Sequence, residues 1–433
     1  MRTGRAVAPG PHGPQENRPY TLKPLRTGHP ADRQDIGCHD RQSATREFRG
    51  GSAMHLSLLQ PIIDRPGPWA SVYAEIPHST EDAAKQRELS ADAAARQLAE
   101  QGADRATCDA VRATLANARA DGEPVDLSGR AVFATGGEVV LDAPLSGRPA
   151  RSFASWSPLP RITPWAEAAA DDVRCLVVYV DREGADFALH SDQGALDAGT
   201  VEGLDWPIHR TATADWSERH FQTAVENTWE QNAGEIAEAA QRVFESCGAQ
   251  VMLLAGDPRE RRSVHDKLPE PLRTVAFESD HGGRAAGADS TRLDRDIAHV
   301  RAGFEHDHVT DVLNRFRAGA DVGGTDPAYA ASGVPALIEA AREHRIDTLI
   351  LTPGSSDAGR EVWVGADPDQ LAVRGTELQY LGETNPSAAR ADDALLRSAA
   401  ATGAEAVVVR DPAEAPAGGL GAILRWSTPT QHQ

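Results

Sequence analysis

Cysteine, lysine and long apolar runs are all scarce in this chain of 433 residues. Its four cysteines lie far apart and form no C-x-x-C pair, which argues against a disulfide framework and against a zinc knuckle. No apolar run reaches the roughly 18 residues that a membrane span needs. The first residues also lack the apolar core of a secretory signal. We therefore expect a cytoplasmic protein without membrane contact.

Positive charge is also in short supply, since 44 basic residues stand against 64 acidic ones and the net charge is −20. Such a protein is a poor candidate for unaided binding to bare nucleic acid, because phosphate contacts need lysine and arginine. We expect no DNA partner. Only three of the basic residues are lysines, and the remaining arginines have forked guanidinium groups that suit phosphate. RNA binding would therefore require local arginine patches.

Sequence motifs for cofactors and for common hydrolases are missing as well. The glycine pairs at 282–283 and 323–324 have no strand before them and no Lys-Ser/Thr after them, so a phosphate-binding loop is not indicated. The run 305–308, Glu-His-Asp-His, invites a metal interpretation. Successive residues on a helix do not face one another, however, and only Glu305 with His308 could pair. A solvated helix face is the alternative, and we predict no cofactor and no metal.

The composition divides the chain into an N-terminal extension and three folded units. Residues 1–53 are rich in Gly, Pro and Arg without an apolar period, which predicts a disordered extension or a mis-assigned start. The folded units are expected at 54–160, 165–290 and 291–433. Strands alternate with helices in the second and third units, so the predicted fold class is α/β.

The first unit, 54–160, has the pattern of a small α+β domain. Alternating apolar residues predict a strand at 69–76, and two short apolar runs around Gly136-Gly137 predict a hairpin. Two helices are expected within 80–120, broken near Gly102. Residues 159–164 are expected to be a proline-containing linker.

The second unit, 165–290, begins with a nearly continuous apolar run at 174–180, typical of a buried strand. A long helix is predicted from Ser217 to Cys247, because its apolar residues recur three, four and seven positions apart. Other elements expected here are strands at 185–190, 251–256 and 274–277, with an arginine-rich turn and a helix at 264–268.

The third unit, 291–433, has the pattern of an α/β/α sandwich. Helices are expected at 293–318, 334–344 and 391–402, and strands at 347–351, 362–364, 406–409 and 418–426.

Three segments are similar to motifs of one known family. The first is 203–210 with a loop, then Ser217 and Phe221 opening the long helix; the second is the strand that ends in Ala255-Gly256; the third is Gly-Gly-Leu-Gly-Ala-Ile-Leu-Arg-Trp at 418–426. In this order they resemble the bacterial branch of the archaeo-eukaryotic release factor family, which includes Pelota and the ribosome hibernation factor Balon. The resemblance covers about 68–430. It implies a small N-terminal domain, a ribonuclease-H-like middle domain and an L7Ae-like C-terminal sandwich.

The chain departs from this family at the loop where peptide release takes place. Release factors carry Gly-Gly-Gln there, whereas this chain has Ala214-Asp215-Trp216. Alanine and aspartate restrict φ where glycine would not, tryptophan cannot place a water, and the negative charge opposes a transition state that itself becomes negative. Gln222 is a poor substitute, because it lies one turn inside the helix. We therefore predict that the protein is not an enzyme; a peptidyl-tRNA hydrolase or rescue factor is the alternative.

Candidate contacts with ribosomal RNA gather at this loop and after the strand 251–256. Trp216 could stack on a base or pack against its own helix, and Ser217 suits an N-cap better than a catalytic role. Three arginines in four positions, 259–262, could hold an anion or form a solvated helix start. The predicted ribosome-binding residues are His209, Arg210, Asp215, Trp216, Arg219, His220, Arg259, Arg261 and Arg262.

The resemblance implies a ribosome-associated factor that occupies the aminoacyl site and blocks translation during stress. It also implies contact with ribosomal RNA and with elongation factor Tu. A third hypothesis is a stress-linked binding protein that never meets the ribosome, which the net charge of −20 favours.

Overall fold

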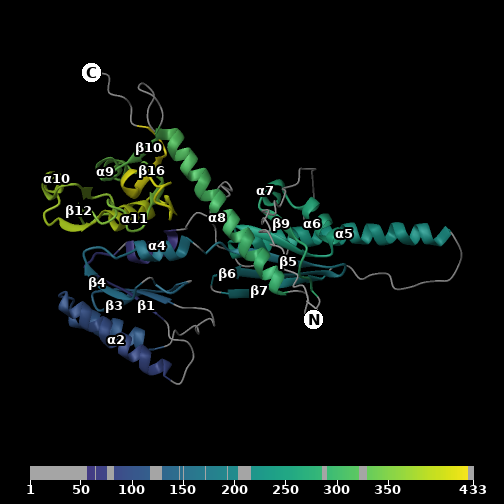
Figure 1. The fold of residues 1–433 in the computed structure, drawn as a ribbon, viewed down its shortest axis with the longest axis horizontal. Helices are drawn as coiled ribbons and strands as arrows, with labels where there is room; N and C mark the ends of the chain where they lie inside the picture. The colour runs from purple at the N-terminus through teal and green to yellow at the C-terminus, as the bar shows by residue number, and fades with distance from the viewer. Residues whose placement is uncertain are drawn as a thin grey trace, which may run out of the picture.

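The structure is a computed structural model that describes residues 56–427, except 64, 76–81, 118–128, 146, 150, 171, 193, 203–215, 285–289 and 321–328. For residues 57–58 and 216–228 it describes the backbone alone. Four sheets and the helices packed on them make a mixed α/β protein in several units (Figure 1). In the part of the chain that is described, no helix is long and apolar enough to cross a bilayer.

The N-terminal unit is an antiparallel sheet with two helices on one face. Its strands β1 (Trp69–Glu75), β2 (Gly129–Thr135), β3 (Glu138–Leu145) and β4 (Phe153–Ser157) lie in the order β3-β2-β1-β4. Alternate residues of β1 point to opposite faces. Ala70 and Val72 therefore pack under α2 (Ala83–Glu100) and α3 (Arg105–Ala116), while Trp69 and Tyr73 face the opposite way. The short segments η1 (Leu56–Leu59) and α1 (Gln60–Ile63) join that second face.

The middle unit is a mixed five-stranded sheet in the order β7-β6-β5-β8-β9. Strands β5 (Cys175–Val180), β8 (Val251–Gly256) and β9 (Ala276–Ser279) are parallel, and β6 (Gly184–Ser191) and β7 (Gly194–Glu202) add antiparallel hairpins. Helices α5 (Trp216–Cys247), α6 (Pro258–Lys267) and α7 (Glu270–Arg273) contribute to the core on one face. Because β5 is covered on both faces, all but one of its residues are buried, as its apolar run predicts.

Helix α8 (Ser290–Ala320) joins the middle unit to the C-terminal unit. Its first half buries Leu293, Ile297 and Val300 against the second face of the middle sheet. Its last turns bury Leu313 and Phe316 against the C-terminal sheet. The helix predicted at 293–318 is thus present, and it serves two sheets rather than one, as its diagonal course in Figure 1 shows.

The C-terminal unit has a four-stranded sheet between helices. Strands β10 (Ala330–Ser332), β11 (Ile346–Leu351), β15 (Glu405–Val408) and β16 (Leu420–Leu424) lie in the order β10-β16-β11-β15. The end of α8 covers one face, and α9 (Val334–Arg342) and α11 (Ala391–Ala401) cover the other. Additional elements are the small sheet β13-β12-β14 (Leu371–Ala372, Glu361–Val364, Ser387–Arg390), α10 (Gly375–Tyr380) and η2 (Ala417–Gly419).

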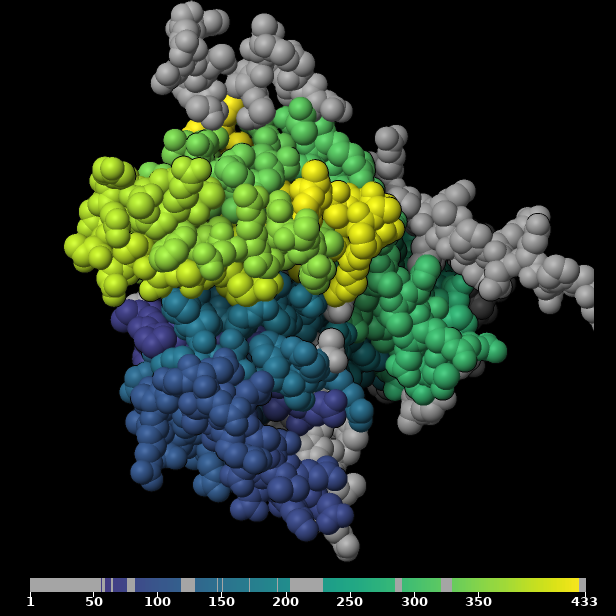
Figure 2. Space-filling view, turned by 60° about the vertical axis from the view of Figure 1, so that its left-hand side comes forward, coloured from purple at the N-terminus to yellow at the C-terminus, as the bar shows by residue number. Residues whose placement is uncertain are grey.

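The N-terminal and C-terminal units share one continuous core. The second face of the N-terminal sheet, with Trp69, Tyr73 and Phe133, belongs to the same buried cluster as Leu395 and Leu396 of α11. Figure 2 shows the C-terminal unit seated directly on the N-terminal one along this seam. Neither the sequence pattern nor the expected domain boundaries indicate this contact.

Several boundaries differ from the prediction for local physical reasons. The linker expected at 159–164 runs into a helix, α4 (Thr163–Ala170), whose second residue is Pro164, in the first turn where a proline is tolerated. The arginine-rich turn after β8 is part of α6, because Asp257 caps it and Pro258 follows at its first position. Strand β7 is exposed along most of its length, so it carries no apolar signal. Helix α5 begins at Trp216, one residue before the predicted start.

Candidate functional site

Helix α5 carries the segment that the release-factor resemblance singles out. Figure 1 shows its N-terminal half extending beyond the sheet that the rest of the helix covers. The first buried residue that the structure describes on this helix is Asn232, 16 positions after Trp216. At a rise of 1.5 Å per residue, the first turn lies about 24 Å along the helix axis from that point. The middle unit therefore presents the start of α5 at the end of a long projection.

The predicted contact residues of this segment fall mostly outside the side chains that the structure describes. His209, Arg210 and Asp215 lie outside the described residues. Trp216, Arg219 and His220 belong to the first turns of α5, where only the backbone is described. The predicted N-cap Ser217 lies inside the helix, whose first residue is Trp216.

The three arginines after β8 differ in exposure, since Arg261 is buried and Arg259 and Arg262 are exposed. Arg261 is only 2% exposed, and its Nη2 donates to Asp280 Oδ1 at 2.8 Å. Arg262 lies 3.6 Å from Asp266 and 4.0 Å from Glu278 in ion pairs. Arg261 is therefore an interior ion-pair partner rather than a contact for ribosomal RNA, because α6 turns its side chain inward. The sequence pattern could not reveal this, since it places the arginines in a turn.

Arg259 is exposed, as is Arg262, and it stacks on helix α5. Its guanidinium carbon lies 4.3 Å from the centre of the Trp229 ring, a cation–π contact. The neighbouring Glu260 is buried and accepts a hydrogen bond from Arg182 Nε at 2.9 Å. Asn232, one turn after Trp229, donates from Nδ2 to the carbonyl oxygen of Arg182 at 3.3 Å. These residues link α5, α6 and the turn between β5 and β6.

The first and last residues of the acidic and histidine run on α8 pair with residues of the C-terminal unit. Glu305 accepts a hydrogen bond from Arg410 Nη1 at 3.1 Å, and His308 Nε2 lies 2.9 Å from Glu405 Oε1. Glu305 and His308 line one small hollow between α8 and β15. Among the described residues, no three His, Cys, Asp or Glu side chains could hold a metal ion together.

Ser279, His281 and Asp296 come together beyond the end of β9. Ser279 Oγ bonds to Asp296 Oδ2, and His281 Nδ1 lies 2.9 Å from the same carboxylate oxygen. A catalytic serine needs a base on its hydroxyl, whereas this serine donates to the carboxylate and to no imidazole. The cluster therefore ties the end of β9 to α8 through the Asp296 carboxylate.

Arg284, from the glycine-rich segment after β9, also serves the fold. Its Nε donates to Asp186 Oδ2 at 3.0 Å and its Nη1 donates to Asp181 Oδ1 at 2.9 Å. These hydrogen bonds, that to Asp186 first, raise the pKa of the guanidinium above its usual value. The segment therefore ties the β5–β6 hairpin to the end of β9.

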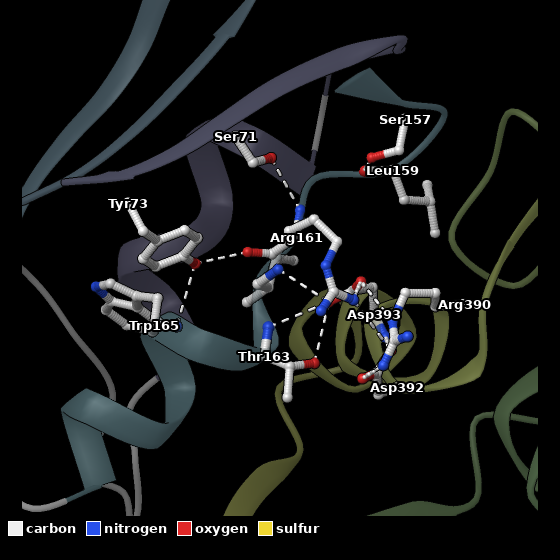
Figure 3. A network of polar contacts seen from close by, with 11 residues as sticks. Ser71, Tyr73, Ser157, Leu159, Arg161, Thr163, Trp165, Arg390, Asp392 and Asp393 are labelled. Atoms are coloured by element: carbon white, nitrogen blue, oxygen red, sulfur yellow. Dashed lines mark hydrogen bonds and ion pairs between the residues drawn. The ribbon is translucent and has the colours of Figure 1, made fainter. Parts of the chain in front are cut away.

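A buried polar network crosses the seam between the N-terminal and C-terminal units. Arg161 and Thr163, just before and at the start of α4, face Asp392 and Asp393 at the start of α11, as Figure 3 shows. On the other side, Tyr73 Oη donates to the carbonyl oxygen of Arg161 at 2.6 Å. Burial raises the pKa of Tyr73 well above its usual value, and burial together with Asp392 raises that of Asp393 to about 6. The network joins β1, α4 and α11.

The middle unit also matches a known protein family. Residues 174–321 match the model of bacterial archaeo-eukaryotic release factor family 2. The matched segment runs from β5 to the end of α8. It therefore contains the five-stranded sheet, the projecting helix α5 and helix α8, which packs on both the middle and the C-terminal sheets. In this segment the protein is release factor-like, in agreement with the motifs at 203–221 and 253–256.

Relatives of nearly full length and solved structures extend the comparison. The chain is 28% identical over 377 residues to the uncharacterized protein Rv2629 of Mycobacterium tuberculosis strain H37Rv, covering 86% of this chain and 97% of that protein. A ribosome-bound archaeal Pelota is 13% identical, with 88% of this chain and 96% of that chain covered and a TM-score of 0.38. Dom34 of S. cerevisiae is 12% identical, with 70% and 82% covered and a TM-score of 0.37.

Proposed function

We propose that this protein binds the ribosome at the aminoacyl site, directs the start of α5 toward the peptidyl-transferase centre and blocks translation there without releasing peptide. The observation that carries the proposal is the projecting helix α5, in a segment that matches a release factor family, entered through Ala-Asp-Trp in place of Gly-Gly-Gln. In the family, the tip before this helix is the part that reaches the peptidyl ester.

The chemistry of the tip supports occupancy rather than hydrolysis. Hydrolysis needs backbone that can approach the ester closely and a group that orients a water. Alanine and aspartate at 214 and 215 restrict φ, and the charge of Asp215 would stand beside an oxyanion and disfavour it. A tryptophan at 216 offers a large aromatic face that suits stacking on a base. We therefore propose that the protein is not an enzyme.

The charge distribution limits how the protein would meet RNA. Along the described part of α5 the exposed charged residues include Glu230, Glu238 and Glu245 with Arg242, so this face is more acidic than basic. Phosphate contacts would then be few. Stacking at the tip and contacts with ribosomal or partner proteins would supply the remaining affinity. Elongation factor Tu is the protein partner we propose, as the family resemblance implies.

Ribosome association tests the proposal directly. Purified full-length protein is mixed with ribosomes from growing and from stressed cells and centrifuged through a sucrose cushion. The expected result is co-sedimentation that competes with aminoacyl-tRNA. A protein that stays in the supernatant with every ribosome preparation would overturn the proposal and favour a binding protein that acts elsewhere.

A release assay separates this proposal from a rescue factor. Ribosomes loaded with labelled peptidyl-tRNA are incubated with the wild-type protein, with a Gln222→Ala variant and with a release factor as positive control. We expect no release above background for either form of the protein. Release by the wild type that is lost in Gln222→Ala would favour a peptidyl-tRNA hydrolase or rescue factor instead.

A further inference from the structure

The direction in which α5 projects depends on the contacts that hold the helix at its base, where it leaves the middle unit, near Trp229. We define the arm as residues 216–228, the part of α5 that precedes Trp229. The arm's first residue lies about 20 Å from Trp229, at 1.5 Å per residue. A tilt of about 10° at the base would move that residue by roughly 3 Å over this length. Since hydrogen bonds tolerate only a few tenths of an ångström, the direction of the arm decides whether its tip meets a fixed target.

Two residues of α5 on one helix face are held at this base. Trp229 carries the guanidinium of Arg259 at 4.3 Å from its ring centre. Asn232, three positions later, is only 2% exposed and donates from Nδ2 to the carbonyl oxygen of Arg182 at 3.3 Å. Residues three apart lie on the same side of a helix. The same face of α5 is thus held by α6 at one turn and by the β5–β6 turn at the next.

The residues of the middle unit that contact α5 are themselves held by hydrogen bonds. Arg259 is the second residue of α6, and its backbone N–H donates to the cap residue Asp257 at 2.9 Å. Arg182 donates from Nε to the buried Glu260, which ties the β5–β6 turn to the same helix. Gly256 allows the end of β8 to lie close to the end of β5, because a Cβ at this position would lie 2.1 Å from the carbonyl oxygen of Val180. Both sets of contacts on α5 therefore come from residues that are hydrogen-bonded to other parts of the middle unit.

We propose that Arg259, Trp229 and Asn232 are positioning residues that set the angle at which the arm leaves the body. We call the contacts of Trp229 with Arg259 and of Asn232 with Arg182 the clamp. The clamp is a property of the isolated protein. The inference rests on the proposed function only for the target that the arm reaches. It gives Arg259 a role other than the RNA contact that the sequence predicts. The guanidinium of Arg259 turns its flat face to the Trp229 ring of α5. Arg259 therefore contributes to ribosome binding by holding the arm and not by contacting RNA.

The first experiment measures the direction of the arm without any ribosome. Spin labels are attached at Thr223→Cys in the arm and at Ala298→Cys, an exposed position of α8. Cys38 and Cys247 are replaced by serine, while the buried Cys108 and Cys175 stay. Electron–electron resonance then gives the distribution of label distances in the full-length protein.

We expect one narrow distribution in the wild type and a clearly broader one in Arg259→Ala and in Trp229→Ala. Arg259→Lys and Trp229→Phe keep a cation over a ring and should remain close to the wild type. Arg262→Ala is the matched control, because this neighbouring arginine is 47% exposed and pairs with Asp266 and Glu278, neither of which belongs to α5. Unchanged distributions in both alanine variants would overturn the clamp, whatever the ribosome result.

The second experiment asks whether Arg259 acts through Trp229 or contacts RNA itself. We expect each alanine variant to bind ribosomes roughly 5- to 30-fold more weakly. The double variant should be no weaker than either single one, because both changes remove the same contact. The dependence of affinity on salt should stay unchanged, whereas loss of a phosphate contact would lower the slope by about one.

The two experiments separate the failure of the clamp from the failure of the proposed function. Additive losses with a reduced salt slope and a narrow distance distribution would identify Arg259 as a direct RNA contact and overturn the clamp. A wild-type protein that ignores ribosomes would overturn the proposed function, and the label distances alone would then decide the clamp.

Discussion

Asp393 and Thr163 lie 230 residues apart in the chain, yet they share two hydrogen bonds across the seam between the N-terminal and C-terminal units. Asp393 Oδ1 accepts from the backbone N–H of Thr163 at 3.1 Å and from its hydroxyl at 3.0 Å. The same oxygen also accepts from the N–H of Ile162 at 2.9 Å. Asp393 thereby caps α4 from another unit, and this cap together with the shared apolar core makes the two units one block.

Removing the Asp393 carboxylate should destabilise this block. In Asp393→Ala the buried N–H groups of Ile162 and Thr163 lose their acceptor, and Arg161 loses one of its two carboxylate partners. We expect the free energy of unfolding to fall by about 2–4 kcal/mol. Denaturant unfolding measures this loss. Arg105→Ala, which removes an exposed ion pair with Asp109, should leave the unfolding midpoint unchanged.

The same carboxyl group predicts a pH dependence with a definite sign. Burial and the neighbouring Asp392 raise the pKa of Asp393 to about 6, above the 3.8 of an unperturbed aspartate. A group whose pKa is higher in the folded state binds its proton more tightly there. Its stabilising contribution is therefore complete below about pH 4 and is lost as the pH rises through about 6.

Comparison with Asp393→Asn isolates this contribution from all other titrating groups. The difference in unfolding free energy, wild type minus variant, should decrease between pH 4 and pH 7 by up to about 3 kcal/mol. Denaturant unfolding at several pH values gives the difference. A difference that stays flat, or that grows with pH, would show that the carboxylate rather than the carboxylic acid is the favoured form at the seam.

Gly256 should be the least replaceable glycine at the end of the central strands. It has φ +132°, and an added Cβ would lie 2.1 Å from Val180 O on the neighbouring strand. We expect Gly256→Ala to cost about 2–4 kcal/mol of unfolding free energy. Gly303→Ala is a suitable comparison, because this glycine lies inside α8 with open space around it. That change should be neutral or stabilise the protein by about 0.5–1 kcal/mol. Equal losses in thermal unfolding would contradict the close-approach explanation.

Trp216→Ala should weaken ribosome binding if the start of α5 meets bases at the aminoacyl site. Loss of one aromatic stacking contact is expected to lower the affinity roughly 5- to 100-fold. Trp426 is the control, because it is a 49% exposed tryptophan that belongs to the C-terminal unit and not to α5. Co-sedimentation titrations with the two variants make the comparison. If both variants bind like the wild type, the tip is not in contact with RNA.

Elements with a strong local pattern could be predicted from the sequence alone. The helix 216–247, the buried strands 175–180 and 346–351, and the hairpin around Gly136-Gly137 all appear close to their expected bounds. In each case the apolar period or the turn residues identify the element without any distant contact. Strand β7 and helix α4 were missed, since the first is largely exposed and the second is stabilised by a cap from α11.

What the amino-acid sequence by itself determined is the order of elements, their amphipathic faces and the tip residues Ala214-Asp215-Trp216, because these depend on residue type and spacing. The tertiary structure decided which charges remain available. It buried Arg261 and paired it with the exposed Asp280, stacked Arg259 on Trp229 and brought Asp393 to Thr163. The energy of a charged side chain depends on the partners and solvent around it, and segments distant in the chain supply those partners. A run of arginines in the sequence therefore cannot show whether it faces a ligand or the protein's own interior.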